Sequence, residues 1–382
     1  MQSSLRLCWL DYLRALNIVA TLLFHSILAY SPFIQANDIS NLPIPFVDAN
    51  TTFPVADIFL LIRPIFSMQL MFFISGLFTW RSLGKRGPIG YVVVRFKRLI
   101  LPLVITWLFI MPVTYVPAVI ANQISFLPIR LTHLWFLWVL FVFDVIIAFI
   151  YSFLRIHIEG LIFFLNNFIL TLLIGFTSVI AYLYSISHAG DTGWQPFFGS
   201  QVFLVPTGWL GLYFFYFLLG VVMGSRSLNN CVMSTNWFSP FSNYSNGLTR
   251  SLICAILVLT LFLQLRANID FLILRLGLSM AWTVVNILYV LSGLLIVASL
   301  ILLSKRFLRR QHFLLDNLSL NSYGLYLIHY TFVVWIQFFL SHSLVIGFVK
   351  PLVVILLCIS LSWYAADLLR RFPLLRSLFT SG

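Results

Sequence analysis

The first apolar segment of the chain carries two side chains that can do chemistry, Arg14 and His25. They lie eleven positions apart, which is about three helical turns and about 16 Å along a helix axis. At about 100° per residue, this spacing returns to nearly the same face of a helix. An ionisable side chain at membrane depth costs at least about 2.5 kcal/mol, so such residues usually face a polar interior. The spacing therefore predicts one inward stripe, with an anion-binding guanidinium near a membrane surface and a proton-transfer group deeper inside.

A second group of basic residues follows the second apolar segment, in the stretch 81–98. Arg95 and Arg98 lie on adjacent turns of a helix, where both guanidiniums can converge on phosphate oxygens. The alternative interpretation is topological, because dense basic loops hold helix pairs in their orientation. Arg14 at the same predicted surface favours the phosphate interpretation. Three guanidiniums around the mouth of a helix bundle would suit a cytoplasmic co-substrate that carries several phosphates.

Polar residues also interrupt the later apolar segments. Asp144 lies in the middle of the fourth segment, where it either joins helices by hydrogen bonds or orients a catalytic partner. His329 lies in the middle of the ninth segment and shares a predicted helix face with Tyr326. Asp144, His329 and Tyr326 are therefore candidates for a supporting role.

A run of aromatic residues begins at His133 and includes Trp135 and Trp138. At the predicted outer surface these side chains form either an ordinary interfacial belt or a binding surface for a polar acceptor. Arg63 lies in the outer half of the second segment, where snorkelling to the surface is a sufficient explanation.

The elements that position these residues are membrane helices, because 61% of the 382 residues are hydrophobic and only 9% are charged. We expect an all-α polytopic membrane protein, with residues 1–382 forming a single domain and no separate soluble domain. Runs of about 20 apolar residues span a bilayer. The sequence predicts about ten of them, at 12–32, 56–80, 99–119, 132–153, 161–185, 202–224, 249–265, 279–303, 318–340 and 346–368.

The net charge of +13 does not indicate nucleic-acid binding, because most basic residues fall in the predicted even-numbered loops and the C-terminal tail. This asymmetry predicts a cytoplasmic N-terminus and a cytoplasmic C-terminus. No cleavable signal peptide is expected, since the first apolar run has full membrane length. The four cysteines have no metal-ligand spacing, so we expect packing thiols and no metal.

Several stretches carry the pattern of a known family. They are the Arg14-to-His25 spacing, Phe72-Phe-Ile-Ser75-Gly76, Arg95-x-x-Arg98-x-x-x-Pro102, His133-Leu-Trp135-Phe136-Leu137, Leu325-Tyr326-Leu-Ile-His329 and Arg371-Phe-Pro373-Leu-Leu-Arg376. In their order and spacing, the chain resembles membrane acyltransferase family 3, and within it the members that succinylate osmoregulated periplasmic glucans. One departure is Tyr330-Thr331, which stands where the family pattern has His-Pro.

The resemblance implies an acyltransferase of the bacterial inner membrane. It implies that acyl-CoA, with succinyl-CoA the expected donor, binds from the cytoplasm through Arg14, Arg95 and Arg98. It also implies that His25 acts as general base on a hydroxyl of a periplasmic glucan, without a bound cofactor. A covalent acyl-histidine would use the same residues and stays open.

The same resemblance suggests roles for the remaining candidates. The run that begins at His133 would face the acceptor, and Arg63 is a candidate partner for the extra carboxylate of a succinyl donor. Besides the lipid bilayer, the expected partners are acyl-CoA, the glucan acceptor and the glucan-synthesis machinery.

Two other classes of protein remain as alternatives. A transporter of glycans or lipid-linked sugars can also use about ten helices with buried charges. A membrane scaffold for a glucan synthase is a further alternative, but it leaves Arg14 and His25 without a role. Coenzyme A discriminates between them, because an acyltransferase binds it whereas a carrier or a scaffold does not.

Overall fold

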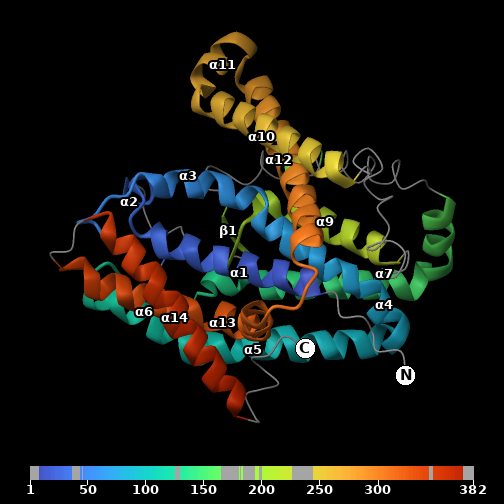
Figure 1. The fold of residues 1–382 in the computed structure, drawn as a ribbon, viewed down its shortest axis with the longest axis horizontal. Coiled ribbons are helices and arrows are strands. Elements are labelled where there is room, and N and C mark those ends of the chain that lie inside the picture. Colours follow the sequence, from blue (N-terminus) through green and yellow to red (C-terminus); the bar gives the residue numbers. More distant parts are fainter. Residues whose placement is uncertain are drawn as a thin grey trace.

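The computed structural model describes residues 8–36, 44, 46–124, 130–164, 180, 182–183, 194–197, 200–225, 244–343 and 347–372, and most of these residues are helical (Figure 1). The helices of the first half are α1 (Cys8–Leu28), α2 (Pro32–Ala36), α3 (Val55–Ile62), α4 (Ser67–Arg95), α5 (Leu101–Ile105), α6 (Met111–Ile120) and α7 (Trp135–Phe164). Those of the second half are α9 (Thr207–Ser225), α10 (Tyr244–Ala267), α11 (Ile269–Leu276), α12 (Leu278–Phe307), α13 (Phe313–Ser341) and α14 (Val349–Arg371). Strands β1 (Gln195–Phe197) and β2 (Ser200–Val205) pair antiparallel.

Seven helical stretches within the described residues are long and apolar enough to cross a membrane. They are Val55–Ile120, Thr132–Phe153, Thr207–Ser225, Gly247–Ala267, Leu278–Phe307, Phe313–Ser341 and Val349–Arg371. The prediction of an all-α polytopic membrane protein is therefore confirmed. The predicted fifth segment, 161–185, lies mostly outside the described residues, and the number of ten spans and the side of each terminus stay predictions.

The predicted basic loop at 81–98 is wrong in its secondary structure, because the chain is helical through this stretch. Helix α4 changes direction at Gly87, whose φ of 69° is accessible to glycine, and Pro88 follows. Two π-helical turns, Phe96–Ile100 and Thr106–Ile110, then lead through α5 into α6. The kink turns the chain without a loop, so the chain stays helical from the start of α4 to the end of α6.

Two further boundaries differ from the predicted segments. The predicted segment 56–80 is interrupted by a 3₁₀ turn at Arg63–Ile65, between α3 and α4. The predicted segment 202–224 begins as a strand, because β2 pairs with β1 up to Val205 and Pro206 separates it from α9. Mean hydropathy detects neither change, since both stretches are predominantly apolar.

Helices α1 and α13 run parallel and in register. The Tyr12 hydroxyl donates to Asp316 Oδ1 at 2.8 Å, and the His25 and His329 rings meet at 2.8 Å between Nδ1 and Nε2. Both pairs are separated by 304 positions in the chain. Because equal separations at two depths require parallel axes, the N-terminal ends of α1 and α13 lie at the same end of the molecule. The Gln337 side chain adds a third connection, donating to the Ser26 carbonyl at 3.1 Å.

Helices α4 and α9 approach each other closely through small residues. A Cβ added at Gly76 would lie 2.2 Å from the Phe217 carbonyl oxygen, and one at Gly220 would lie 2.2 Å from the Phe73 carbonyl oxygen. No real Cβ tolerates such a contact, so both positions require glycine. Small residues that allow backbones to approach are typical of helix packing in membranes.

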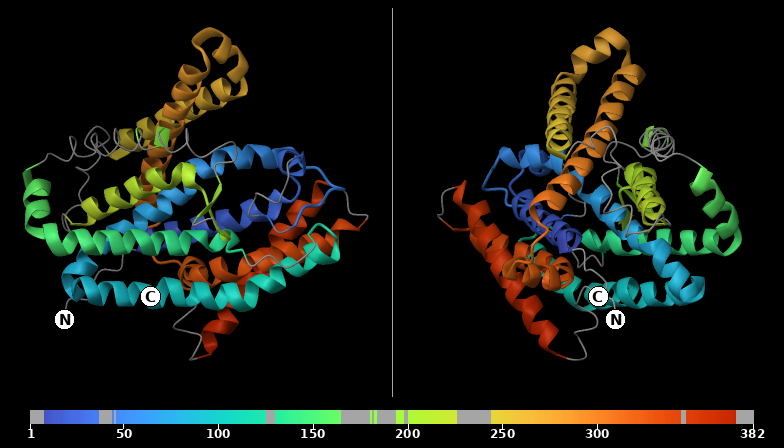
Figure 2. Two further views of the ribbon diagram at one scale, coloured as in Figure 1. Left: turned by 180° about the vertical axis from the view of Figure 1, so that it is seen from behind. Right: turned by 45° about the vertical axis from the view of Figure 1, so that its right-hand side comes forward.

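Helices α10, α11 and α12 form a hairpin that projects from the remaining helices (Figures 1 and 2). A buried hydrogen bond between the Ser251 and Ser299 hydroxyls joins α10 to α12. The α1, α4, α9 and α13 helices, by contrast, lie in the body of the molecule and position the residues described next.

Candidate active site

Three histidines from three separate elements meet inside the helix bundle. His25 comes from α1, His329 from α13, and His133 from the 3₁₀ turn that precedes α7. The His25 and His329 rings stack with centroids 5.1 Å apart, and the His133 ring lies edge-on to both, at 6.2 Å and 4.9 Å. His133 and His329 are buried, whereas His25 is half-buried. We call these three residues the histidine cluster.

The hydrogen bonds of His329 determine which nitrogen of each ring carries the proton. His329 Nδ1 lies 2.9 Å from the Tyr326 carbonyl and 3.1 Å from the Leu325 carbonyl. Carbonyl oxygens only accept, so Nδ1 carries the proton and the Nε2 of neutral His329 accepts. His25 Nδ1 therefore donates to His329 Nε2, and the lone pair of neutral His25 is on its Nε2. This arrangement suits proton acceptance by His25.

His133 is held in place by a strained backbone. Thr132, the residue before it, has a φ of 41°, which costs a β-branched residue of order 1–3 kcal/mol. The turn is fixed on both sides, because the Leu131 amide donates to the Val202 carbonyl of β2 and the Tyr326 hydroxyl donates to the His133 carbonyl at 2.5 Å. His133 Nε2 is buried and has no hydrogen-bond partner among the described residues.

Polar residues lead along α1 from its N-terminal end to the histidine cluster. Asn17 exchanges hydrogen bonds with Ser67 at the start of α4, at 2.9 Å and 3.0 Å. One turn further, Thr21 Oγ1 accepts from Arg63 Nη2 at 2.8 Å, and Arg63 Cζ lies 4.4 Å from the Phe24 ring centroid. Asn17 and Thr21 lie on α1 between Arg14 and His25. These four residues form the stripe that the sequence predicts on α1, and we call them the α1 polar stripe.

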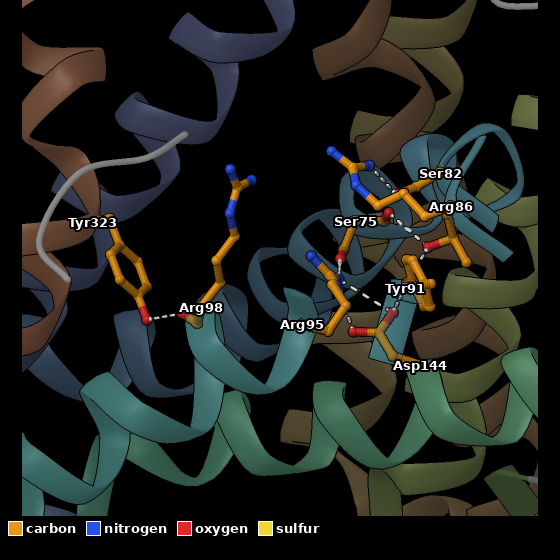
Figure 3. Close-up of polar contacts among 9 residues, drawn as sticks. Ser75, Ser82, Arg86, Tyr91, Arg95, Arg98, Asp144 and Tyr323 are labelled. Atoms are coloured by element: carbon orange, nitrogen blue, oxygen red, sulfur yellow. Dashed lines mark hydrogen bonds and ion pairs between the residues drawn. The ribbon is translucent and has the colours of Figure 1, made fainter. Parts of the chain in front are cut away.

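Arg95 is bound to protein groups on one side of its guanidinium (Figure 3). Its Nε lies 2.5 Å from Asp144 Oδ2, and its Nη2 lies 3.2 Å from Asp144 Oδ1 and 2.6 Å from Ser75 Oγ. The Tyr91 hydroxyl also donates to Asp144 Oδ1. Asp144 therefore joins α7 to α4, and the same buried carboxylate sets the direction of Arg95 and offsets its charge.

Arg98 and Arg14 are more accessible than Arg95. Arg98 is exposed, its side chain lies beside the Arg95 group without a dashed contact to it, and its carbonyl accepts from the Tyr323 hydroxyl at 2.7 Å (Figure 3). Arg14 is half-buried and lies 3.6 Å from Asp11, one turn earlier on α1. The surface ion pair is weak, so Arg14 can exchange Asp11 for another anion.

The two tryptophans of the predicted acceptor surface, Trp135 and Trp138, pack against other aromatic rings inside the protein. Trp135 is buried and stacks on Tyr213, with ring centroids 5.7 Å apart. Trp138 is half-buried and meets Phe203 edge-on. Only His133 of this run lies in the histidine cluster, so Trp135 and Trp138 form its packed surroundings.

Sequence reasoning missed three contributors to the site. Thr21 lies four positions before His25, and Asn17 lies four before Thr21, so their spacing on α1 was a detectable signal. Tyr330 was noted only as a departure from a pattern, yet its ring lies 4.6 Å from that of His25. No signal in the sequence indicates that His133 joins His25, because the two belong to different elements.

The fold and the histidine cluster define a polytopic membrane protein with three histidines gathered in its interior. The model of the acyltransferase domain of family 3 matches residues 8–367, nearly the whole chain. The chain therefore belongs to membrane acyltransferase family 3, and it is an acyltransferase. No curated protein and no solved structure matches it.

Proposed function

We propose that the protein transfers an acyl group from cytoplasmic acyl-CoA to a hydroxyl of a periplasmic glucan, in the inner membrane of a bacterium. The observation that carries this proposal is the α1 polar stripe, which joins a guanidinium at one end of α1 to the histidine cluster deeper in the bundle. Family membership supports the acyl transfer itself.

The donor binds at the cytoplasmic end of α1. Arg14 and Arg98 bind its phosphates, since Arg98 is exposed and Arg14 is half-buried beside Asp11, with which it forms a weak ion pair. Arg95, oriented by Asp144, adds the nitrogen Nη1, which has no partner among the described residues. The extended pantetheine arm is about as long as the separation of about 16 Å between Arg14 and His25, so it brings the thioester to the histidine cluster.

The chemistry is a direct acyl transfer with His25 as general base. His25 Nε2 accepts the proton of the acceptor hydroxyl while the oxygen attacks the thioester carbonyl carbon. A new C–O ester bond forms, the C–S bond breaks, and the proton on His25 passes to the departing thiolate of coenzyme A. His329 holds His25 in the required tautomer through the 2.8 Å hydrogen bond.

The finer identity of the substrates rests on sequence resemblance. The motifs resemble those of glucans biosynthesis protein C, for which a succinyl donor and an osmoregulated periplasmic glucan are the expected substrates. The glucan enters from the periplasmic side and reaches His25 beside His133. No cofactor stays bound, and the glucan-synthesis machinery is a candidate partner that supplies the acceptor.

The test is acyl transfer by the purified protein in liposomes, with radiolabelled succinyl-CoA and a β-glucan acceptor. His25→Ala is expected to lower transfer by about 10²- to 10⁴-fold, the usual contribution of a general base. His342→Ala is the matched control, because His342 is an exposed histidine at the end of α13 and lies outside the site.

Each outcome of this test has a definite meaning. Transfer by wild type and by His342→Ala, with loss in His25→Ala, supports the proposal. Full activity of His25→Ala would refute the assignment of His25 as the general base. Transfer from acetyl-CoA alone would retain the reaction and change the donor, whereas a folded protein that binds no coenzyme A would indicate a transporter.

A further inference from the structure

Arg63 lies on a rigid turn at the level of the histidine cluster. The 3₁₀ turn Arg63–Ile65 interrupts the helix between α3 and α4. The carbonyl of Pro64 accepts from Gln69 Nε2 at 2.8 Å and from the Tyr289 hydroxyl at 2.9 Å. Irregular backbone at membrane depth occurs where it is buried in protein or lines a cavity, so this turn places its side chains inside the protein.

The Arg63 guanidinium has neutral partners only. Its Nη2 donates to Thr21, its Cζ lies over the Phe24 ring, and its Nε is buried without a hydrogen-bond partner among the described residues. A buried charge is usually paired, because an isolated one is costly to desolvate. Snorkelling therefore does not explain Arg63, since its guanidinium bonds to the middle of α1 rather than reaching a membrane surface.

The carboxylates that the structure describes are engaged elsewhere. Asp11 pairs with Arg14, Asp48 with Lys350, Asp144 with Arg95, and Asp367 with Arg370 and Arg371; Asp57 accepts from Ser31, Asp316 accepts from Tyr12, and Asp270 is exposed on α11. Within the described residues, the charge of Arg63 thus lacks an anion, which a ligand can supply.

We propose that Arg63 binds a carboxylate at the far end of the acyl chain, so that the enzyme takes donors with dicarboxylic acyl groups such as succinyl. This inference rests on the acyl transfer proposed above. Arg63 donates to Thr21, which lies four residues before His25 on α1, or about 6 Å along the axis. Because Thr21 lies on the Arg14 side of His25, the acyl chain turns back beside the pantetheine arm, and four carbons span a comparable distance between a thioester carbon beside His25 and a carboxylate beside Arg63.

The geometry favours the acyl carboxylate over the thioester oxygen as the ligand of Arg63. A donor to the developing oxyanion must lie about 3 Å from that oxygen, in contact with the reacting atoms. The guanidinium instead packs on Phe24 and bonds to Thr21, one turn away from His25. It is therefore placed for the end of the chain, where it acts in donor specificity.

The experiment compares succinyl-CoA with butyryl-CoA, which has the same chain length but no terminal carboxylate. In liposomes, wild type is expected to prefer succinyl-CoA. Arg63→Met is expected to lower kcat/KM for succinyl-CoA by about 10- to 100-fold, the size of one charge-assisted hydrogen bond, and to change butyryl transfer by less than about threefold. Arg275→Met is the matched control, because it removes an exposed arginine of α11 that also lies near an aromatic ring.

A second variant and a binding measurement guard against a folding defect in Arg63→Met. Arg63→Lys keeps the charge and is expected to retain part of the preference, and competition between succinyl-CoA and butyryl-CoA for binding is measured on both variants. Equal loss of both donors would assign Arg63 to the oxyanion and overturn the inference. An unchanged preference in Arg63→Met, or no preference in wild type, would also overturn it while the acyl transfer stands. Absence of transfer from every acyl-CoA would instead refute the proposed function.

Discussion

The proposed general base, His25, depends on one partner, His329, for the position of its proton. His329 Nδ1 donates to the backbone carbonyls of Tyr326 and Leu325 on its own helix, at 2.9 Å and 3.1 Å. Its Nε2 is then restricted to accepting, which directs the proton of His25 to Nδ1 and leaves His25 Nε2 as the base. In the proposed mechanism, His329 is in this sense a positioning residue, and His25 is the residue that touches the substrate.

Substitution of His329 tests this dependence. We expect His329→Ala to lower kcat about 10- to 100-fold, the worth of one orienting hydrogen bond, with little change in the KM for acyl-CoA. His329→Gln, whose amide oxygen can accept from His25, is expected to retain more activity. Steady-state kinetics of both variants in liposomes would show it, and an unchanged kcat in His329→Ala would contradict the assignment.

At the scale of the element, interruptions of helices decide where the polar groups lie. The turn at Arg63–Ile65 directs a guanidinium to α1, and the kink at Gly87 returns the chain so that Arg95 reaches Asp144 of α7. Close packing fixes these elements, since α4 and α9 meet where Gly76 and Gly220 leave no space for a Cβ. Packing of this kind is strongly distance-dependent.

This packing predicts opposite effects for two glycines on neighbouring elements. Gly220→Ala is expected to destabilise the protein by about 1–3 kcal/mol through overpacking, because its Cβ would lie 2.2 Å from the Phe73 carbonyl oxygen. Gly84→Ala, whose Cβ would lie 3.7 Å from the Tyr151 hydroxyl, is the control and is expected to be neutral or stabilising. Thermal unfolding in detergent measures both, and equal melting temperatures would refute the close contact.

At the scale of the whole molecule, the proposed reaction requires a fixed orientation in the membrane. Parallel packing of α1 and α13 places Tyr12 and Asp316 at one end, and the histidine cluster lies further along both helices. The charge asymmetry of the loops predicts that this end is cytoplasmic. The donor and acceptor would then approach the histidine cluster from opposite sides.

Cysteine labelling tests this orientation. Lys85 and Arg275 are both exposed, and the predicted topology puts Lys85 in the cytoplasm and Arg275 in the periplasm. In intact cells, an impermeant maleimide is expected to label Arg275→Cys and to label Lys85→Cys only after permeabilisation. The parent protein gives the background from its own four cysteines. The reverse labelling pattern would invert the proposed route of the donor.

Much of the fold follows from the sequence, because hydropathy acts through local stretches of chain. The predicted segment 132–153 coincides with the observed span Thr132–Phe153, and the predicted segment 279–303 lies within Leu278–Phe307. The α1 polar stripe is also local, since the spacing of Arg14 and His25 on one helix face is a property of eleven successive positions. These features needed no knowledge of the neighbouring helices.

The composition of the site was decided only by the tertiary structure. The contact of His25 with His329 joins residues 304 positions apart, and that of Arg95 with Asp144 joins residues 49 apart. No periodicity within one segment specifies such pairs, because they depend on which helices pack together and in which register. The sequence by itself therefore determined the class of protein and the polar face of α1. The packing of α13, α7 and the Arg63 turn against that face determined how its residues are protonated, oriented and charged.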